Sequence, residues 1–443
     1  MTGLNTIYQR PAEMLQALVR FDTTNPPGNE AECITYLDGL LKSIGQETTL
    51  LYKDPNRPNL IARLKGAGSA PPLLLQGHVD VVPTTGQPWT HPPFSGEVID
   101  GSIWGRGTLD MKGGVAMMVA ACMKARAEGT TLPGDVLLCV LSDEEVGGDA
   151  GAKFLVEEHA ELFEGVRYAL GEIGGFSFYF GDKCFYPIQV AEKGVCWMRA
   201  TMRGQAGHAS MPMPGGAIVA LADMLAALGT ERLPVHITPA AQLMLEAMRD
   251  ALEDDTKSLM ENLLDPEQAD AVLDELGDTG RFMNALLHNT ASPTIIQASS
   301  KINVLPAAIT VEIDGRLLPG QTAEDMVAEI RALIDDDIEL EVVRTDPMAA
   351  DTDMALFDML AGILREADPD GIPVPMLMPA VTDGRFFSRL GIQTYGFTPM
   401  KLPPDNDFLS SIHNADERIP VDALDFGTDA IFKALQRFGD VAK

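Results

Sequence analysis

The sequence predicts an α/β protein in which a three-layer α/β domain is interrupted by a smaller α+β domain of the ferredoxin-like kind. Two observations lead to this prediction. Apolar runs such as LLLQG and VLLCV alternate with helical stretches, which is typical of a largely parallel sheet covered by helices. Near residue 194 the strands begin to alternate polar and apolar positions, and beyond about 350 the earlier pattern returns. We therefore expect one domain from residues 1–193 and 346–443, with 194–345 inserted.

The elements of the first domain follow in chain order. Residues 10–45 predict a helix that is interrupted at Asn25-Pro26-Pro27-Gly28, because proline and glycine end helices. Further elements are expected as strands at 59–64, 72–77 and 136–141 and as helices at 113–128 and 150–160. The strand at 72–77 is nearly all apolar, so it is placed in the middle of the sheet. The helix at 113–128 is rich in alanine and methionine and is expected to be amphipathic.

The inserted domain has a different order of elements. They are expected as a strand at 195–203, a helix at 215–229, an acidic helical stretch to about 290, strands at 295–304 and 307–316, and a helix at 322–335. This order is a β-α-β-β-α module with an acidic helical insertion. A helix at 354–366 and a strand at 392–397 then return the chain to the first domain.

The charge and the cysteines exclude several classes of protein. The chain has 33 Lys+Arg against 64 Asp+Glu, a net charge of −31, which argues against binding nucleic acid or an anionic membrane. The first residues contain no secretory signal, and no apolar stretch is long enough to span a bilayer. The five cysteines are scattered without a CxxC pair. We therefore expect reduced thiols and a cytoplasmic protein.

Histidines and acids recur at the ends of the predicted strands. His78 and Asp80 directly follow an apolar run, and residues i and i+2 of an extended chain share a face, so the carboxylate can orient the ring or share its ion. The other segments are GRGTLDMKGG with Asp110, LSDEEVGG with Asp143, Glu144 and Glu145, YALGEIGG with Glu172, and HNADERIP with His413. Each segment alone has a structural explanation. Together they form a set of histidines and carboxylates that suits zinc, cobalt or manganese, and a bridged pair better than one ion.

These segments resemble the dinuclear zinc amidohydrolases that include acetylornithine deacetylase, succinyl-diaminopimelate desuccinylase, aminoacylase and carboxypeptidases G and S. The similar stretches are LLLQGHVDVVP, WGRGTLDMKGG, LSDEEVGG, GQAGHASMP, SPTIIQASSKINVLP, TDGRFF and IHNADERI. They occur in the family's order across most of the chain. The resemblance implies that the larger domain is catalytic, that the inserted one is a lid or dimerisation domain, and that the protein hydrolyses an amide bond next to a free carboxylate.

The resemblance also implies a role for each metal-site residue. His78 and Glu172 would bind one metal, His413 and Glu145 the other, and Asp110 would bridge them. Asp80 would orient His78, and Glu144 would be the general base. Aminoacylase-like members often have Asp-Glu-Gly where this chain has Gly171-Glu172-Ile173, so Glu172 is assigned by similarity to members that use glutamate there.

Three further residues are implied to contact the substrate. His208 in the inserted domain would contact the carbonyl oxygen as an oxyanion forms. Arg385 and Asn303 would hold the substrate's carboxylate, and the planar guanidinium of arginine pairs with carboxylates through two hydrogen bonds. A structural ion pair is the alternative explanation for Arg385.

Other functions stay open at this point. A dipeptidase or aminopeptidase of the same family would need an acidic residue for the substrate's amino group, and none is identifiable in the sequence. A metal-free binding protein on the same fold is disfavoured, because the presumed ligands and base are all present. The substrate is expected to be a small molecule or peptide, and a homodimer is possible because the lids of dimeric relatives pair with each other.

Overall fold

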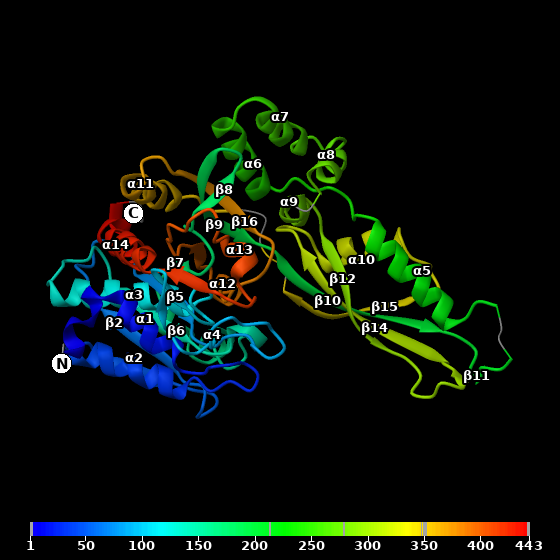
Figure 1. Cartoon of the computed structure of the whole chain (residues 1–443), viewed down its shortest axis with the longest axis horizontal. Coiled ribbons are helices and arrows are strands. Elements are labelled where there is room, and N and C mark those ends of the chain that lie inside the picture. Colours follow the sequence, from blue (N-terminus) through cyan, green and yellow to red (C-terminus); the bar gives the residue numbers. More distant parts are fainter. Residues whose placement is uncertain (1–2, 212–213, 278–279, 347, 349–351, 441–443) are drawn as a thin grey trace. The chain divides into compact units, whose positions relative to one another are not determined.

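The computed structural model describes residues 3–211, 214–277, 280–346, 348 and 352–440. The chain has the α/β fold that the sequence predicts, and it divides into two compact units (Figure 1). Unit 1 comprises Met1–Val190, Asp353–Met376 and Thr382–Lys443, and unit 2 comprises Ala191–Thr352 and Leu377–Val381. No helix in the described ranges is long and apolar enough to cross a membrane.

The core of unit 1 is a mixed sheet. Among the described residues its strands run in the order β1-β2-β6-β3-β7-β17-β9-β16, with β8 beside β9. Their bounds are β1 Thr48–Leu51, β2 Asn59–Leu64, β3 Leu73–His78, β6 Val136–Leu141, β7 Tyr168–Gly171, β8 Phe178–Phe180, β9 Lys183–Glu192, β16 Ile372–Met378 and β17 Gln393–Gly396. β3 is interior, as predicted, and it runs parallel to both β6 and β7, while β17 runs parallel to β7. The carboxyl ends of these four strands therefore share one edge of the sheet.

Helices cover both faces of this sheet. They are α1 Pro11–Val19, α2 Ala31–Ser43, α3 Lys112–Ala127, α4 Ala152–Glu158, α11 Phe357–Ala367, α12 Gly384–Ser388, α13 Phe408–Ser411 and α14 Val421–Arg437, with the short 3-10 turns η1 Leu4–Gln9, η2 Glu144–Val146, η3 Ala160–Phe163 and η5 Phe438–Asp440. On one face α3 packs against β3 and β6, and on the other α4 and α12 pack against Leu74, Leu137 and Leu141. A small sheet of β4 Val98–Ile99, β5 Ser102–Trp104 and β18 Arg418–Pro420 completes the unit.

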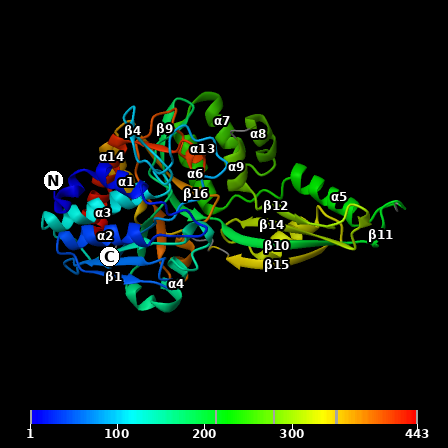
Figure 2. The same cartoon turned by 60° about the horizontal axis from the view of Figure 1, so that its bottom comes forward.

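The prediction of an amphipathic helix at 113–128 is wrong about its exposure. In α3 every residue except Lys124, Arg126 and Ala127 is buried. The reason is that α1 and α14 pack against its outer side (Figure 2), so the helix lies between the sheet and a further layer. Even Lys112 is buried, and its amine donates to the carbonyl oxygens of Leu18 and Phe21 at 3.1 and 2.8 Å.

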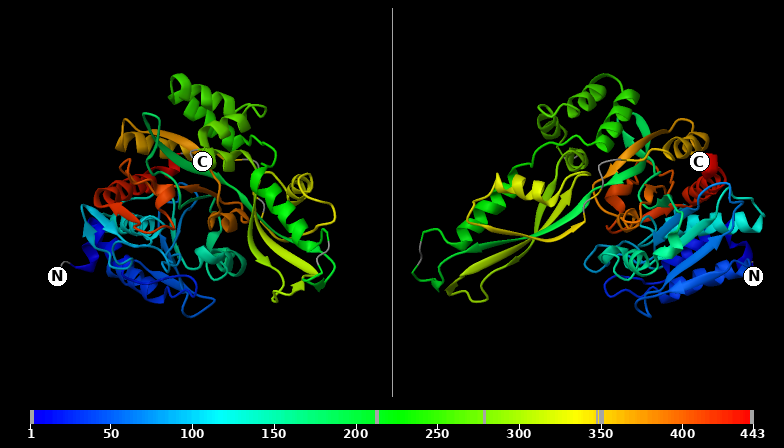
Figure 3. Two further views of the ribbon diagram at one scale, coloured as in Figure 1. Left: turned by 45° about the vertical axis from the view of Figure 1, so that its right-hand side comes forward. Right: turned by 180° about the vertical axis from the view of Figure 1, so that it is seen from behind.

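Unit 2 contains an antiparallel sheet, which Figure 3 shows from two sides. The strands run in the order β12-β14-β10-β15, with bounds Thr290–Gln297, Ala308–Leu317, Gly194–Arg203 and Glu339–Asp346. Helices α5 Ala217–Thr230 and α10 Ala323–Arg331 bury Met224 and Met326 in one core with Met198 and Ile313 of the sheet. A short hairpin pairs β11 Gly207–His208 with β13 Val304–Leu305. The acidic stretch forms α6 Pro239–Ala251, α7 Asp254–Leu263, α8 Ala269–Leu276 and α9 Gly280–Leu287.

The expected strand at 295–304 is displaced in the structure, where β12 ends at Gln297. β12 is an edge strand, so one side of its backbone has no neighbouring strand and its side chains are largely exposed. Ile295 and Ile302, both within the expected strand at 295–304, are exposed. Apolar residues therefore do not indicate the bounds of this strand, because an edge strand such as β12 buries few of its side chains.

Candidate dinuclear metal site

The parallel strands bring the sequence motifs together at one edge of the sheet. His78, the last residue of β3, pairs with Leu141, the last residue of β6, and the acidic segment after β6 follows at once. β7 ends at Gly171, directly before Glu172. Asp110 lies two residues before the start of α3, in a loop that leads into this face. Residues far apart in the sequence thus meet because their strands end side by side.

The first half of the site consists of His78, Asp110 and Glu172, all of them buried. The ring Nε2 of His78 lies 3.2 Å from Asp110 Oδ1 and 3.3 Å from Glu172 Oε2. The other ring nitrogen, Nδ1, donates to the backbone carbonyl oxygen of Asp80 at 2.9 Å. That bond leaves Nε2 as the nitrogen that faces the two carboxylates.

The second half consists of Asp110, Glu145 and His413. The ring Nε2 of His413 lies 3.2 Å from Asp110 Oδ2 and 3.2 Å from Glu145 Oε2. Asp110 therefore directs one carboxylate oxygen to each histidine. This is the arrangement expected of a carboxylate that bridges two ions.

The donor set fits a pair of divalent cations. In each half, three ligand atoms lie within 4.8 Å of one another. Glu145 Oε1 is buried and has no hydrogen-bond partner among the described residues, which is costly unless a cation satisfies it. Hydrogen bonds that the His413 ring donates to Asp110 and Glu145 raise the pKa of His413 to about 10, and burial raises the pKa of Glu145 to about 7. The cluster therefore attracts positive charge strongly, and its ligands of nitrogen and oxygen suit zinc, cobalt or manganese.

Asp80 organises the segment that carries Glu144 and Glu145. Its carboxylate accepts hydrogen bonds from the backbone N–H groups of Glu144 at 3.2 Å and of Glu145 at 3.1 Å, and from Asn25 Nδ2 at 2.8 Å. The same carboxylate lies 3.5 Å from His78 Nδ1, farther than the Asp80 carbonyl oxygen. Asp80 thus holds the ring through its backbone and the acidic segment through its side chain.

Sequence reasoning missed a buried network behind the acidic segment. Asn25 Nδ2 also donates to Asp143 Oδ1 at 3.1 Å, and Asp143 accepts from Arg57 Nη1 at 2.7 Å. Arg57 in turn pairs with the buried Glu30 at 2.7 Å. The only available signal was the Asn-Pro-Pro-Gly turn, which predicts a break in the helix but not where its asparagine points.

Glu144 lies beside Arg385 at the edge of the cluster. Arg385 Nη1 is 3.9 Å from Glu144 Oε1, and it donates to the carbonyl oxygen of Thr382 at 3.2 Å. Burial raises the pKa of Glu144 well above its usual range, and the nearby charge of Glu172 adds to the effect. A carboxyl group in this environment holds a proton more readily than one in water, which suits a group that accepts and then releases a proton.

Asp383, which sequence reasoning also missed, is buried next to these residues. Both of its carboxylate oxygens lack hydrogen-bond partners within the described part of the chain, and burial raises its pKa to about 8. A Cβ atom at Gly148 would lie 3.0 Å from Asp383 Oδ1 and 2.7 Å from the Phe386 ring. The second glycine of LSDEEVGG is therefore needed because the TDGRFF segment packs against it.

His208 and Asn303 both lie in unit 2, on the short hairpin. The backbone N–H of Ala209 donates to the carbonyl oxygen of Asn303 at 3.1 Å, so the two residues are close. Nδ1 of His208 accepts from the backbone N–H of Ser210 at 3.2 Å and lies 2.7 Å from its hydroxyl. In the neutral ring the proton is therefore on Nε2, which is free to donate.

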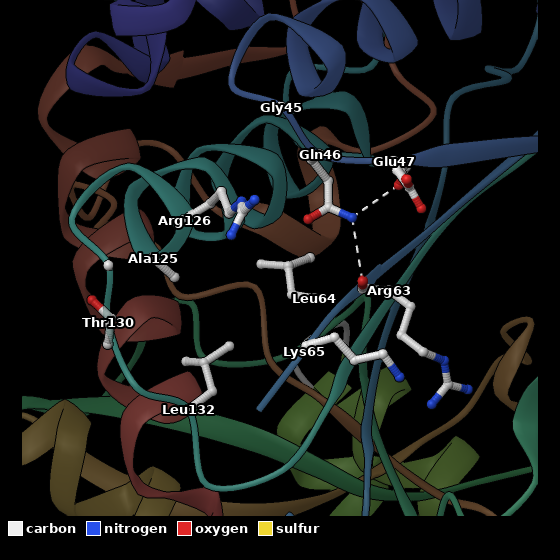
Figure 4. A pocket seen from close by; sticks show the side chains of 11 residues that line it. Gly45, Gln46, Glu47, Arg63, Leu64, Lys65, Ala125, Arg126, Thr130 and Leu132 are labelled. Atoms are coloured by element: carbon white, nitrogen blue, oxygen red, sulfur yellow. Dashed lines mark hydrogen bonds between the residues drawn. The ribbon is translucent and has the colours of Figure 1, made fainter. Parts of the chain in front are cut away.

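A separate hollow of about 400 Å³ in unit 1 contains none of the clustered residues (Figure 4). It lies beside β2 and the end of α3, where Gln46 Nε2 donates to the carbonyl oxygens of Glu47 and Arg63. Its cations Arg63 and Lys65 are both paired with Asp135, at 3.2 and 2.9 Å. Arg126 lines the hollow as well, and its lining includes no histidine and one acid, Glu47, so the hollow lacks the donor set of the metal cluster.

Comparison with known proteins agrees with this geometry. Residues 74–437 match the model of Peptidase family M20/M25/M40. A probable carboxypeptidase S-like protein of Dictyostelium discoideum is 28% identical over 82% of this chain and 71% of its own length. The N-fatty-acyl-amino acid synthase/hydrolase PM20D1 of Xenopus tropicalis is 29% identical over 80% of this chain and 70% of its own. An M20 metallo-carboxypeptidase from Sulfolobus solfataricus has the same fold, with a TM-score of 0.68 and 16% identity over 97% of this chain and 99% of its own. The chain therefore belongs to the peptidase family M20/M25/M40 and is a metal-dependent hydrolase.

Proposed function

We propose that the protein hydrolyses an amide bond next to a free carboxylate, as an N-acyl amino acid hydrolase or a carboxypeptidase. The observation that carries the proposal is the position of Asp110, with one oxygen 3.2 Å from His78 and the other 3.2 Å from His413. His78 and Glu172 would hold one ion, and His413 and Glu145 the other. The names of the relatives, an N-fatty-acyl-amino acid hydrolase and a carboxypeptidase S-like protein, support the same class of substrate.

The proposed chemistry divides between the ions and the chain. Two divalent cations supply Lewis acidity, which lowers the pKa of water and polarises the scissile carbonyl group. Glu144 accepts a proton from the attacking water and passes it to the leaving amine. Its raised pKa suits both steps. The N–H at Nε2 of His208 would donate to the carbonyl oxygen as negative charge develops there.

Substrate binding is assigned to Arg385 and Asn303, with the substrate's carboxylate as their target. Arg385 is buried, and its Nε has no hydrogen-bond partner among the described residues, so the guanidinium retains a free donor. Residues 194–345 would act as a lid, since His208 and Asn303 belong to them. We propose zinc as the metal and the cytoplasm as the location, which the five free cysteines favour. A homodimer is part of the proposal, and measurement of the molecular mass in solution tests it.

The first experiment replaces the base. Glu144→Gln should lower turnover by roughly 10²–10⁴-fold, because general base catalysis contributes this much. The variant should keep its metal, since Glu144 is not one of the proposed ligands. Metal analysis and turnover are measured on the same sample. Turnover equal to that of the wild type would disprove the role of Glu144.

The second experiment tests the substrate's carboxylate. A panel of N-acyl amino acids, dipeptides with a free amine, and carboxyl-amidated versions of both distinguishes the proposed activity from a dipeptidase. Arg385→Lys should raise KM for substrates with a free carboxylate. Arg389→Lys is the matched control, because both guanidinium groups stack on the Phe386 ring, at 4.5 and 4.9 Å. Equal activity on amidated and free substrates would exclude Arg385 as the anchor.

A further inference from the structure

Glu417 is a fully buried carboxylate that organises the loop in front of α3. Its Oε1 accepts hydrogen bonds from the backbone N–H groups of Leu109 at 2.7 Å and Asp110 at 3.2 Å. Its Oε2 accepts from the backbone N–H of Gly107 at 3.1 Å and from Arg106 Nη1 at 2.7 Å. Four donors thus converge on one carboxylate, and one of them is the backbone of the residue that lies between the two histidines.

Arg106 continues this network to the loop that carries His413. Its Nη1 donates to the carbonyl oxygen of Asn414 at 3.0 Å, and its Nη2 donates to Gln87 Oε1 at 2.7 Å. Gln87 Nε2 donates to the carbonyl oxygen of His413 at 2.8 Å. The guanidinium also stacks over the Trp89 ring at 5.1 Å. Arg106 is itself buried, so its charge is compensated mainly by Glu417.

The second half of the metal site depends on loops for its shape. His413 has a φ of 60°, and its side chain is half-exposed. No strand ends at His413, whereas His78 is the last residue of β3 and Glu172 directly follows β7. The hydrogen bonds to the His413 and Asn414 carbonyl oxygens therefore link this loop to the network that holds the backbone of Asp110, and Thr90 adds two hydrogen bonds to Asp416 of the same loop.

We propose that Glu417 and Arg106 are positioning residues that hold Asp110 and His413 at their mutual distance, and that the second metal position depends on them more than the first. The inference rests on the proposed dinuclear function. Glutamine at 417 has nearly the shape of glutamate but carries an NH₂ group in place of one oxygen. That group would face N–H donors on one side of the network, so two of the four hydrogen bonds would be lost.

The test is a titration of metal-stripped protein with Co²⁺ or Zn²⁺, followed by direct analysis of bound metal. Glu417→Gln should bind the first equivalent with the affinity of the wild type and the second roughly 10- to 100-fold more weakly, which is the usual effect of altering groups behind metal ligands. Asp368→Asn is the matched control. Asp368 is another buried acid of unit 1, bound to Tyr186 at 2.8 Å and Lys401 at 2.9 Å, and it contacts none of the clustered residues.

Gln87→Met provides a second variant that keeps the buried ion pair intact. It removes the hydrogen bond that Gln87 donates to the His413 carbonyl oxygen and the two that Gln87 accepts from Arg106 and Trp89, so it should also weaken the second equivalent and leave the first unchanged. If Glu417→Gln does not fold, as judged by thermal unfolding without metal, this variant decides. Wild-type binding of both equivalents in the folded variants would overturn the inference, as would equal weakening of both positions or equal weakening by Asp368→Asn. A wild-type protein that binds no metal and hydrolyses no amide would instead refute the proposed function.

Discussion

The two halves of the metal cluster are built from different kinds of structure. His78 and Glu172 follow parallel strands in the interior of the sheet, and both are buried. His413 lies on a loop, with 51% of its side chain exposed and a φ of 60°. A histidine in that conformation costs about 1–2 kcal/mol relative to a usual one. The sheet therefore fixes the first half directly, and the second half depends on the hydrogen-bond network of Glu417, Arg106 and Gln87.

This difference has a consequence for metal affinity. Ligands that are already held in place lose little conformational freedom when an ion binds, whereas ligands on a loop lose more. Asp110 is common to both halves and offers a separate carboxylate oxygen to each. We therefore expect a tight position at His78 and Glu172 and a weaker position at His413 and Glu145.

The largest effect is expected from Asp110→Asn, which would break both halves at once. The variant should hold fewer than one metal per chain. Loss of metal assistance removes several kcal/mol of transition-state stabilisation, and turnover should fall by roughly a thousand-fold or more. Metal analysis and turnover measure the two effects, and Asp368→Asn serves as the control for loss of a buried acid. Retention of two metals would contradict the bridging role of Asp110.

Two histidine variants test most directly whether the two metal positions differ in affinity. His413→Ala should keep one tightly bound metal, because His78, Asp110 and Glu172 are unchanged. His78→Ala should lose the tight position and show only weak binding. Calorimetric titration of each variant with Zn²⁺ gives the affinity and the stoichiometry. If the two variants show the same stoichiometry and the same change in affinity, the two metal positions are equivalent and the predicted difference between them is wrong.

A smaller effect concerns pH, and its sign follows from the pKa of His413. Hydrogen bonds that the ring donates to Asp110 and Glu145 raise that pKa to about 10, so the ring holds a proton at neutral pH. A metal binds the neutral ring, so binding must release this proton. Affinity at the second position should therefore fall as pH falls, by about tenfold per pH unit for one displaced proton.

Calorimetry in two buffers with different ionisation enthalpies measures the released protons. The wild type should show a buffer-dependent heat at the second equivalent, and His413→Ala, which is expected to keep one metal, should lack that second heat altogether. A heat that is the same in both buffers would contradict proton release at this ring. The first half of the site differs in how its histidine is held. His78 donates to the backbone carbonyl oxygen of Asp80, and a substitution of the Asp80 side chain does not remove this hydrogen bond.

Local patterns in the sequence predict the frame of the site well. Strand β2 has the predicted bounds, β3 begins and ends one residue later than predicted, and the motifs that follow β3, β6 and β7 meet at one edge as parallel strands require. The contacts behind these motifs could not be predicted. Glu417 bonds to Asp110 across 307 positions of the chain, and Asn25 bonds to Asp143 across 118. A single sequence carries no signal for such pairings, because each residue alone is equally compatible with an exposed polar position.

Burial was the other quantity that local patterns misjudged. The sequence of α3 contains lysines and an arginine, which favour an amphipathic helix, yet a further layer of helices covers it. In unit 2 a strand was expected at 295–304, whereas β12 spans Thr290–Gln297 and forms an exposed edge. Both errors arise because burial depends on what packs against an element, and neighbours distant in sequence decide this.

The most direct test of the account is a measurement of turnover against bound metal in the wild-type protein. Metal-stripped protein is titrated with Zn²⁺ or Co²⁺, and hydrolysis of an N-acyl amino acid is recorded at each step together with the amount of bound metal. We predict two metals per chain in two distinguishable steps, with full hydrolysis only after the second. Full hydrolysis with one metal, or hydrolysis without metal, would contradict it.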